Sequence, residues 1–272
     1  MQKFLISPIA MSSGLLRNRH LVWSLVKRDV LGRYRGSMFG ILWSFFNPLL
    51  MLLIYTFVFS VIFKARWSAG STSKVEFAMV LFSGLLVFNI FSECLNRAPS
   101  LVLMNVNYVK KVVFPLEILP MVSLGCALFH GAVSFLVWLL FHCVFFGLPP
   151  ATAWLLPVVL LPMLCLTMGL SWLLASLGVY LRDVSQVILL VTTALLFLSP
   201  IFYPISALPE DIQRFILLNP MTSIVEDVRG VLVQGTVPEW GGLLLRLAGS
   251  AFVAWLGFAW FQKTREGFAD VL

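Results

Sequence analysis

The side chains that could carry out catalysis are scattered through this sequence and form no recognisable motif. The sequence contains no G-x-S-x-G, no H-E-x-x-H, no D-x-D pair and no G-x-x-x-x-G-K-[ST] loop for nucleotide phosphates. No two cysteines have the C-x-x-C spacing of a metal or redox site. We therefore predict no catalytic residue, no metal site and no disulfide. The residues concerned are His20, His130, His142, Cys94, Cys126, Cys143 and Cys165.

Ionisable residues are rare within the long apolar runs, and those present lie near the ends of the runs. Glu93 and Arg97 are four residues apart, which puts both side chains on one helix face and predicts an ion pair. Glu117 begins the next run, and Arg182 and Asp183 occupy a short turn between two later runs. The absence of charge from the centres of the runs argues against a proton- or sodium-coupled transporter and against a selective cation channel. If the protein performs energy-driven work, we expect another protein chain to supply the energy, because this sequence has no nucleotide-binding loop.

The elements that position these residues are apolar helices long enough to cross a membrane. The 272-residue chain is 60% hydrophobic and only 11% charged, with a mean hydropathy of +0.96. A soluble domain is about half apolar and a quarter charged. Runs of about twenty apolar residues cross the hydrocarbon layer as helices. We predict an all-α polytopic membrane protein with six transmembrane helices, at about 37–63, 76–97, 115–147, 154–180, 184–203 and 243–262.

These spans divide the chain into an N-terminal part (1–36), a six-span domain (37–262) and a tail (263–272). With the N-terminus inside, thirteen of the 19 Lys and Arg residues fall on the inner side. This bias predicts that both termini are cytoplasmic. The segment 201–240 mixes prolines, acids and short apolar groups, which predicts two short re-entrant helices at the outer surface between spans five and six. A purely aqueous loop is the alternative.

The densest positive charge of the chain stands directly before the first predicted span. An apolar stripe with a tryptophan and a basic back is typical of a helix that lies in the membrane interface. The charges alone would serve equally well as a positive-inside signal, but the amphipathic stripe favours an interfacial helix, which we predict for this N-terminal part. Gly32, Gly36 and Gly40 follow at four-residue spacing and predict either a sharp bend or a close helix approach. On a helix over 17–35, the stripe is formed by Val22, Trp23, Val26, Val30 and Tyr34.

The loop over 98–115 is polar and basic, between two apolar spans. A short helix here could dock onto a cytoplasmic partner, and a solvated loop is equally compatible with the sequence. The residues that suggest docking are Asn105, Asn107, Lys110 and Lys111.

The first predicted span carries aromatic residues within about a third of a turn of one another. Aromatic faces stack on the apolar C–H surfaces of sugar rings, so these residues are candidates to face a glycan. Ordinary packing is the alternative for each of them. The residues are Trp43, Phe46, Tyr55 and Phe59.

Several stretches together resemble one family of membrane proteins. They are 27-KRDVLGRYRGSMFGILWSFFNPLLMLLIYTFVFSVIFKARW-67, 105-NVNYVKKVVFPLEILP-120, 178-GVYLRDV-184, 198-LSPIFYPIS-206 and 218-LNPMTSIVEDVRGVL-232. In this order they cover nearly the whole chain and resemble the ABC-2 type permeases that export cell-surface polysaccharides. O-antigen exporter permeases are the most similar variety, and capsule and teichoic acid permeases are related.

The resemblance implies a half-transporter without enzymatic activity in the inner membrane of a bacterium. Two copies would form the path, and each would bind one copy of a cytoplasmic ATPase subunit that holds ATP and Mg²⁺. No cofactor is expected in this chain, and no nucleic acid partner. The substrate would be a polysaccharide on a polyprenyl diphosphate. An ABC-2 permease for a drug or another lipid is the first alternative, and a membrane enzyme acting on polyprenyl lipids is a weaker one.

The resemblance also implies roles for particular segments. The ATPase would contact the helix at 17–35, the loop at about 100–112 and the turn at 178–184, and segment 201–240 would cap the channel. Because clustered arginines match phosphate geometry, we further predict that Arg28, Arg33 and Arg35 attract the lipid diphosphate. The predicted ATPase-coupling residues are Arg28, Asp29, Asn105, Asn107, Lys110, Lys111, Arg182 and Asp183.

Overall fold

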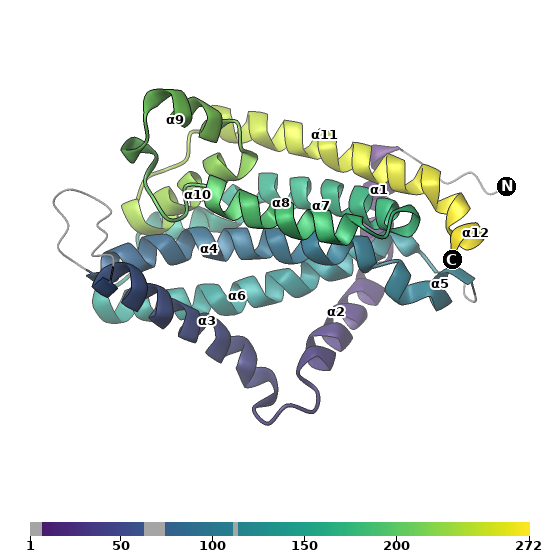
Figure 1. The fold of residues 1–272 in the computed structure, drawn as a ribbon, viewed down its shortest axis with the longest axis horizontal. Coiled ribbons are helices and arrows are strands. Elements are labelled where there is room, and N and C mark those ends of the chain that lie inside the picture. The colour runs from purple at the N-terminus through teal and green to yellow at the C-terminus, as the bar shows by residue number, and fades with distance from the viewer. Residues whose placement is uncertain (1–6, 63–73, 111–113) are drawn as a thin grey trace.

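The computed structural model describes residues 7–62, 74–110 and 114–272, and every regular element in these ranges is a helix. The prediction of an all-α chain is therefore confirmed for the part of the chain that is described. Its helices lie side by side along one axis in an elongated bundle (Figure 1). The bundle is built from α3 (Trp43–Tyr55), α4 (Lys74–Arg97), α6 (Leu119–Phe145), α7 (Leu156–Tyr180), α8 (Val184–Leu198) and α11 (Trp240–Thr264).

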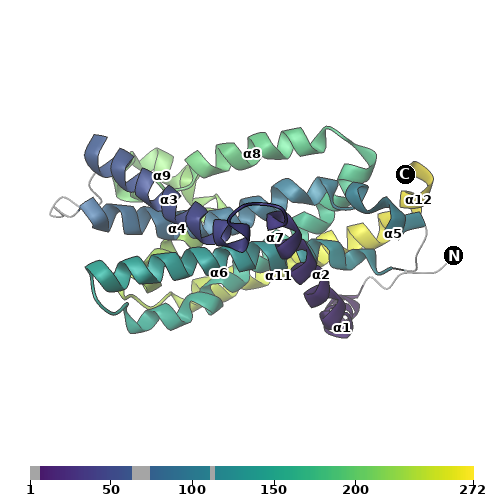
Figure 2. The same cartoon turned by 90° about the horizontal axis from the view of Figure 1, so that it is seen from below.

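Six further α-helices of the described ranges lie at the ends and along one side of this bundle. Helix α1 and the C-terminus lie toward the same end, which we call the terminal end, and α9 lies at the opposite end (Figures 1 and 2). These six helices are α1 (Pro8–Arg17), α2 (Arg19–Tyr34), α5 (Val106–Lys110), α9 (Glu210–Leu217), α10 (Pro220–Arg229) and α12 (Phe268–Val271).

Five segments of the described chain are long and apolar enough to cross a membrane. Four of them match predicted spans to within a few residues, and the last also includes the C-terminal tail, which was predicted to lie outside. The fifth predicted span, 184–203, is shorter than expected: α8 ends at Leu198 because Ser199 takes an extended conformation before Pro200. The five segments are Gly40–Phe59, Val75–Ser100, Leu116–Phe145, Ala151–Tyr180 and Trp240–Val271.

Helix α4 is the centre of the bundle, with 78% of its most apolar stretch buried. Trp138 of α6 is fully buried and donates its indole N–H to the carbonyl of Met79 on α4, at 3.3 Å. Helices α7 and α11 approach so closely that a Cβ at Gly257 would lie 2.0 Å from the carbonyl oxygen of Gly169. Small residues at this crossing let the two backbones meet, as is common between membrane helices.

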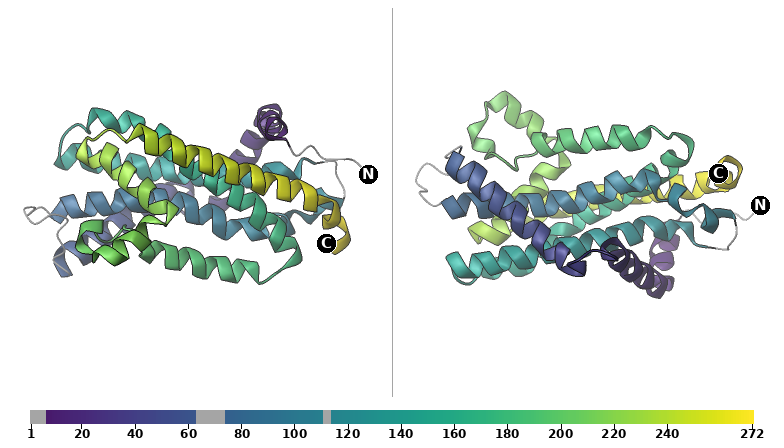
Figure 3. Two further views of the ribbon diagram at one scale, coloured as in Figure 1. Left: turned by 90° about the horizontal axis from the view of Figure 1, so that it is seen from above. Right: turned by 60° about the horizontal axis from the view of Figure 1, so that its bottom comes forward.

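Helix α8 stands at the edge of the bundle, apart from most of its neighbours (Figures 2 and 3). Large apolar side chains along it are exposed, among them Leu190 and Phe197. One buried polar contact ties it to the centre: the hydroxyl of Thr192 donates to the side-chain oxygen of Asn96 on α4, at 2.8 Å. This helix is therefore the least enclosed of the long elements.

Helices α2 and α3 form a V that projects from the side of the bundle (Figure 1). The predicted bend between them is confirmed, and it is made by Gly36 at φ +87° and Gly40 at φ +53°. These angles are unfavourable for residues with a Cβ and easy for glycine. Gly32, the first member of the predicted series, lies inside α2 and makes no bend.

Candidate functional site

Helix α2 is fastened to the bundle by a face that differs in part from the predicted stripe. Leu25, Val26 and Val30 are buried, whereas Trp23 is 71% exposed. The contact with α6 is close, because a Cβ at Gly125 would come within 2.5 Å of a Val26 methyl group. The apolar face of α2 therefore packs on protein, while Trp23 points outward.

Two cross-helix ion pairs hold the same helix to α4. Asp29 pairs with Arg97 at 2.5 Å, and Arg33 pairs with Glu93 at 2.8 Å. The predicted Glu93–Arg97 pair is therefore wrong. These two side chains share a face of α4, as their spacing requires, but that face meets a helix that offers the opposite charge to each of them.

His130 of α6 completes this cluster, although nothing in its sequence surroundings marked it. Its Nδ1 atom lies 3.0 Å from the Glu93 carboxylate, and its Nε2 atom lies 3.2 Å from the hydroxyl of Tyr34. Burial raises the pKa of Tyr34 above its ordinary value, so this phenol stays protonated at neutral pH. Three elements thus meet at one half-buried polar cluster.

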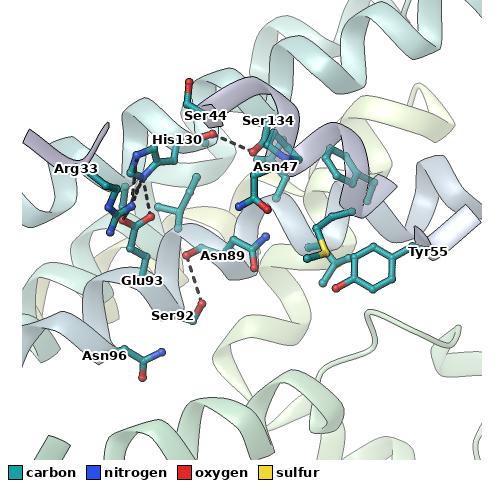
Figure 4. Close-up of a pocket in the computed structure, with 18 of the residues that line it drawn as sticks. Arg33, Ser44, Asn47, Tyr55, Asn89, Ser92, Glu93, Asn96, His130 and Ser134 are labelled. Atoms are coloured by element: carbon teal, nitrogen blue, oxygen red, sulfur yellow. Dashed lines mark hydrogen bonds and ion pairs between the residues drawn. The ribbon is translucent and has the colours of Figure 1, made fainter. Parts of the chain in front are cut away.

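A pocket of about 400 Å³ opens beside this cluster, between α3, α4 and α6 (Figure 4). Arg33, Glu93 and His130 line it together at one end, and its lining also includes apolar residues such as Met51 and Leu86. Hydroxyl and amide groups cover much of the rest, and they both donate and accept hydrogen bonds. Such a lining suits a ligand rich in hydroxyl groups. The polar residues are Ser44, Asn47, Tyr55, Asn89, Ser92, Asn96 and Ser134.

The four predicted glycan-facing aromatics are not gathered in this pocket, and only Tyr55 of them lines it. The ring centroids of Trp43 and Phe46 lie 6.4 Å apart near the bend, whereas Phe59 stacks on Phe202 with ring centroids 5.6 Å apart. For Phe59 the reason is a change in helix type, because α3 continues as a π-helix over Thr56–Ile62; Trp43 and Phe46 lie at the start of α3, before this change. A π-helix has a wider turn than an α-helix, so a projection at 100° per residue misplaces Phe59.

The predicted ATPase-coupling residues fall into three elements at the terminal end. Arg28 on α2 donates to the hydroxyl of Tyr108 at 3.1 Å, and this bond raises the pKa of Arg28 above its ordinary value. Asp29 is engaged with Arg97, and Asn105 donates its amide to the Leu101 carbonyl at 2.8 Å. Arg28 itself is exposed, as are Asn107 and Lys110 on α5 and Arg182 and Asp183 in the turn between α7 and α8; Lys111 lies outside the described residues.

The arginines predicted to attract a lipid diphosphate are only partly brought together. Arg28 and Arg33 border one shallow depression, and Arg97 of α4 contributes the third guanidinium there. Arg35 is exposed at the C-terminal end of α2, where the chain turns toward the bend. The sequence could not indicate Arg97, because its distance from Arg28 along the chain hides their proximity.

A second charged cluster lies at the opposite end of the bundle. Arg229 of α10 is fully buried; it bonds to the Ile201 carbonyl and the Glu226 carboxylate, both at 2.8 Å. Burial lowers the pKa of Arg229 to about 10, which leaves it charged at neutral pH. Asp227 pairs with Arg246 of α11. These contacts anchor the segment that carries α9 and α10 to the bundle.

Within the described ranges, no three His, Cys, Asp or Glu side chains come close enough to hold a metal ion. The geometry of the described chain instead points to the polar pocket, which residues of α2 and α3 border. Exposed charged residues lie at the terminal end. A model of the ABC-2 type transporter family matches residues 20–233, most of the chain. This chain belongs to the ABC-2 type transporter family. The predicted resemblance is thus confirmed for the family, whose members are transporter membrane subunits rather than enzymes.

Relatives of this ABC-2 transporter chain match more than nine tenths of its length. It is 30% identical to the O-antigen export system permease protein RfbA of Myxococcus xanthus, over 94% of this chain and 96% of the relative. It is 26% identical to a protein of the same name from Klebsiella pneumoniae, over 91% and 93%. The polysialic acid transport protein KpsM of Escherichia coli is 25% identical, over 93% and 96%.

Proposed function

We propose that this chain is the permease subunit of an ATP-driven exporter that moves a polyprenyl-diphosphate-linked surface polysaccharide, O-antigen, across the cytoplasmic membrane. The observation that carries the proposal is the similarity over 94% of the chain to a permease named for O-antigen export. The pocket beside α2 adds chemical support. Its amide, hydroxyl and Tyr55 groups suit the hydroxyl groups of a sugar.

The path for the polysaccharide would be completed by a second copy of this chain. The pocket is open on one side, and α8 exposes large apolar residues that lipid or a partner copy must cover. A homodimer would place two such pockets around one channel. Arg28 and Arg33, with Arg35 nearby, would attract the diphosphate of the lipid carrier at the terminal end, and Arg97 would assist them.

Two copies of a separate ATPase subunit would drive transport and would bind ATP and Mg²⁺. The sequence of this chain contains no phosphate-binding loop of the Walker type. The docking elements would be α2, α5 and the turn between α7 and α8. Exposed charged residues on these elements, such as Lys110 and Arg182, suit contact with a soluble protein.

In the membrane, the terminal end would face the cytoplasm and α9 and α10 would form re-entrant helices at the outer surface. The bias of Lys and Arg toward the predicted inner side supports this orientation. Helix α8 would be the fifth of six crossings. Its 15 residues span only about 22 Å, so the bilayer would thin locally or the adjoining segment would dip into it.

A capsule exporter is the second candidate, and the match to KpsM favours it as a specific alternative. Teichoic acid, other lipids and drugs are further substrates that ABC-2 permeases could accept. The identity to KpsM is lower than that to the Myxococcus permease, so we place O-antigen first.

The test is to co-purify this chain with the ATPase of its own cell in lipid nanodiscs. We expect the lipid-linked O-antigen of that cell to stimulate ATP hydrolysis, and capsule or teichoic precursors to have little effect. Stimulation by a capsule precursor alone would favour the second candidate. Failure of any ATPase subunit to co-purify would contradict the exporter proposal itself.

A further inference from the structure

The C-terminal tail over 263–272, for which the sequence predicted only a cytoplasmic location, is folded into the terminal end. After α11 the chain makes a tight turn over Arg265–Gly267 and then forms the short helix α12. The side chain of Phe268 is completely buried. A free tail would leave this ring in water, so the tail is a packed part of the molecule.

The turn that begins the tail is locked to the end of α7. Thr264 receives a hydrogen bond on its carbonyl from the hydroxyl of Tyr180, at 2.9 Å. Its own hydroxyl lies 2.7 Å from that of Ser176. A Cβ at Gly267 would come within 2.7 Å of the Tyr180 hydroxyl, so the backbone passes against the hydroxyl end of this side chain.

A nearly buried ion pair ties the same turn to the far end of the polar loop. Arg265 bonds to the Glu117 carboxylate at 2.6 Å and to the Phe114 carbonyl at 2.7 Å. The two side chains of the pair are 14% and 12% exposed. Burying two charges is worthwhile only where the geometry is good and further hydrogen bonds are made.

Helix α12 therefore lies between two elements that are about seventy residues apart in the chain. It contacts both α5 and α7. The ring centroids of Phe268 and Tyr180 lie 6.0 Å apart. Phe268 also belongs to the buried apolar cluster against which Tyr108 and Phe114 pack. Arg28 of α2 also donates a hydrogen bond to Tyr108 on α5. Helix α5 is thus contacted by both the tail and α2.

The outer faces of α5, α12 and the turn between α7 and α8 are exposed and carry charges of both signs. Lys110 on α5 and Arg182 in the turn are positive, whereas Asp183 and Asp270 are negative. Leu181 and Val271 add exposed apolar area, at 58% and 51%. Mixed charge around a few apolar groups suits a soluble protein partner and does not suit lipid.

We propose that α5, α12 and the turn between α7 and α8 form one continuous docking surface, and that the ATPase subunit binds to it with the tail at its centre. This inference rests on the proposed function, because the partner is the ATPase proposed there. It adds α12 to the docking elements proposed there, which were α2, α5 and the turn between α7 and α8, and gives the tail the task of fixing α5 and the turn relative to each other.

The experiment places a photo-cross-linking amino acid at Ala269, Asn107 or Leu148 in the full chain, expressed with its ATPase subunit. Ala269 and Asn107 are exposed on the docking surface, and Leu148 is 90% exposed at the opposite end. We expect both docking positions, and not Leu148, to cross-link to the ATPase. Cross-linking from Asn107 without Ala269 would overturn the inference and leave the proposed function intact. If neither cross-links, ATPase docking on these elements fails as a whole.

A binding measurement provides the second readout. Ala269→Trp adds bulk on the exposed face of α12, and Ala207→Trp makes the same change at an exposed position of the opposite end. We expect Ala269→Trp to weaken ATPase binding about tenfold, and Ala207→Trp to leave it unchanged. Equal affinity of both variants would place the tail outside the interface.

Discussion

At the scale of single residues, charges in this protein act between helices rather than along them. The spacing of Glu93 and Arg97 correctly indicated a shared face of α4, but it could not indicate that α2 meets this face with Asp29 and Arg33. His130 was missed for a similar reason. A histidine within an apolar run has no spacing that distinguishes a polar cluster from ordinary packing, because its partners come from other elements.

The pair of Arg265 and Glu117 gives a prediction at this scale. Replacing either residue by Leu leaves one nearly buried charge without its partner, which costs about 3–5 kcal/mol. We expect both single variants to lower the midpoint of thermal unfolding in detergent strongly. The double variant should cost much less than the sum of the two, because no charge then remains unpaired. Strictly additive losses would contradict the pairing.

At the scale of elements, composition and periodicity were sufficient to predict which long apolar segments are helices, because an apolar run of about twenty residues leaves few alternatives in a membrane. They were not sufficient where the helix type or its end changes. The π-helix over Thr56–Ile62 displaced Phe59, and the stop at Leu198 shortened α8. The fold of the tail was also missed, since Phe268 and Arg265 find their partners more than eighty residues away.

The bend between α2 and α3 gives a second prediction, for which a substitution at the nearby Gly32 serves as the control. Gly36→Ala puts a Cβ on a backbone at φ +87°, which costs about 1–2 kcal/mol. Gly32→Ala lies within α2 with open space around it and should stabilise by up to about 1 kcal/mol. The thermal midpoint should therefore fall for Gly36→Ala and hold or rise for Gly32→Ala. A fall of similar size in both variants would show that the loss at Gly36 does not come from its positive φ.

At the scale of the whole molecule, the two ends of the bundle should lie on opposite sides of the membrane. Leu148 is 90% exposed at one end and Val271 is 51% exposed at the other. In cells whose outer membrane has been permeabilised, we expect a membrane-impermeant maleimide to label Leu148→Cys directly. It should label Val271→Cys only after the inner membrane is permeabilised. The reverse pattern would contradict the orientation predicted from the Lys and Arg bias. Cys143→Ser in both variants removes the exposed native thiol.

The pocket connects this orientation to transport, because it lies beside α2 and between three of the long helices (Figure 4). Asn89 lines it and is exposed to the open side. Asn89→Leu removes a donor and an acceptor without burying a polar group, so folding and assembly with the ATPase should be unaffected. Hydrolysis stimulated by the lipid-linked polysaccharide should fall about tenfold, the effect of losing about 1.4 kcal/mol of binding.

The matched change Gln234→Leu removes the same groups at an exposed position far from the pocket. It should leave both basal and stimulated hydrolysis at the level of the unmodified protein. If Asn89→Leu and Gln234→Leu behave alike, the amide groups of the pocket do not contact the polysaccharide. The path would then have to run along another face of the bundle, for which the exposed side of α8 offers apolar groups but few polar ones. A sugar chain makes hydrogen bonds throughout its length, so a path without polar partners would need water to supply them.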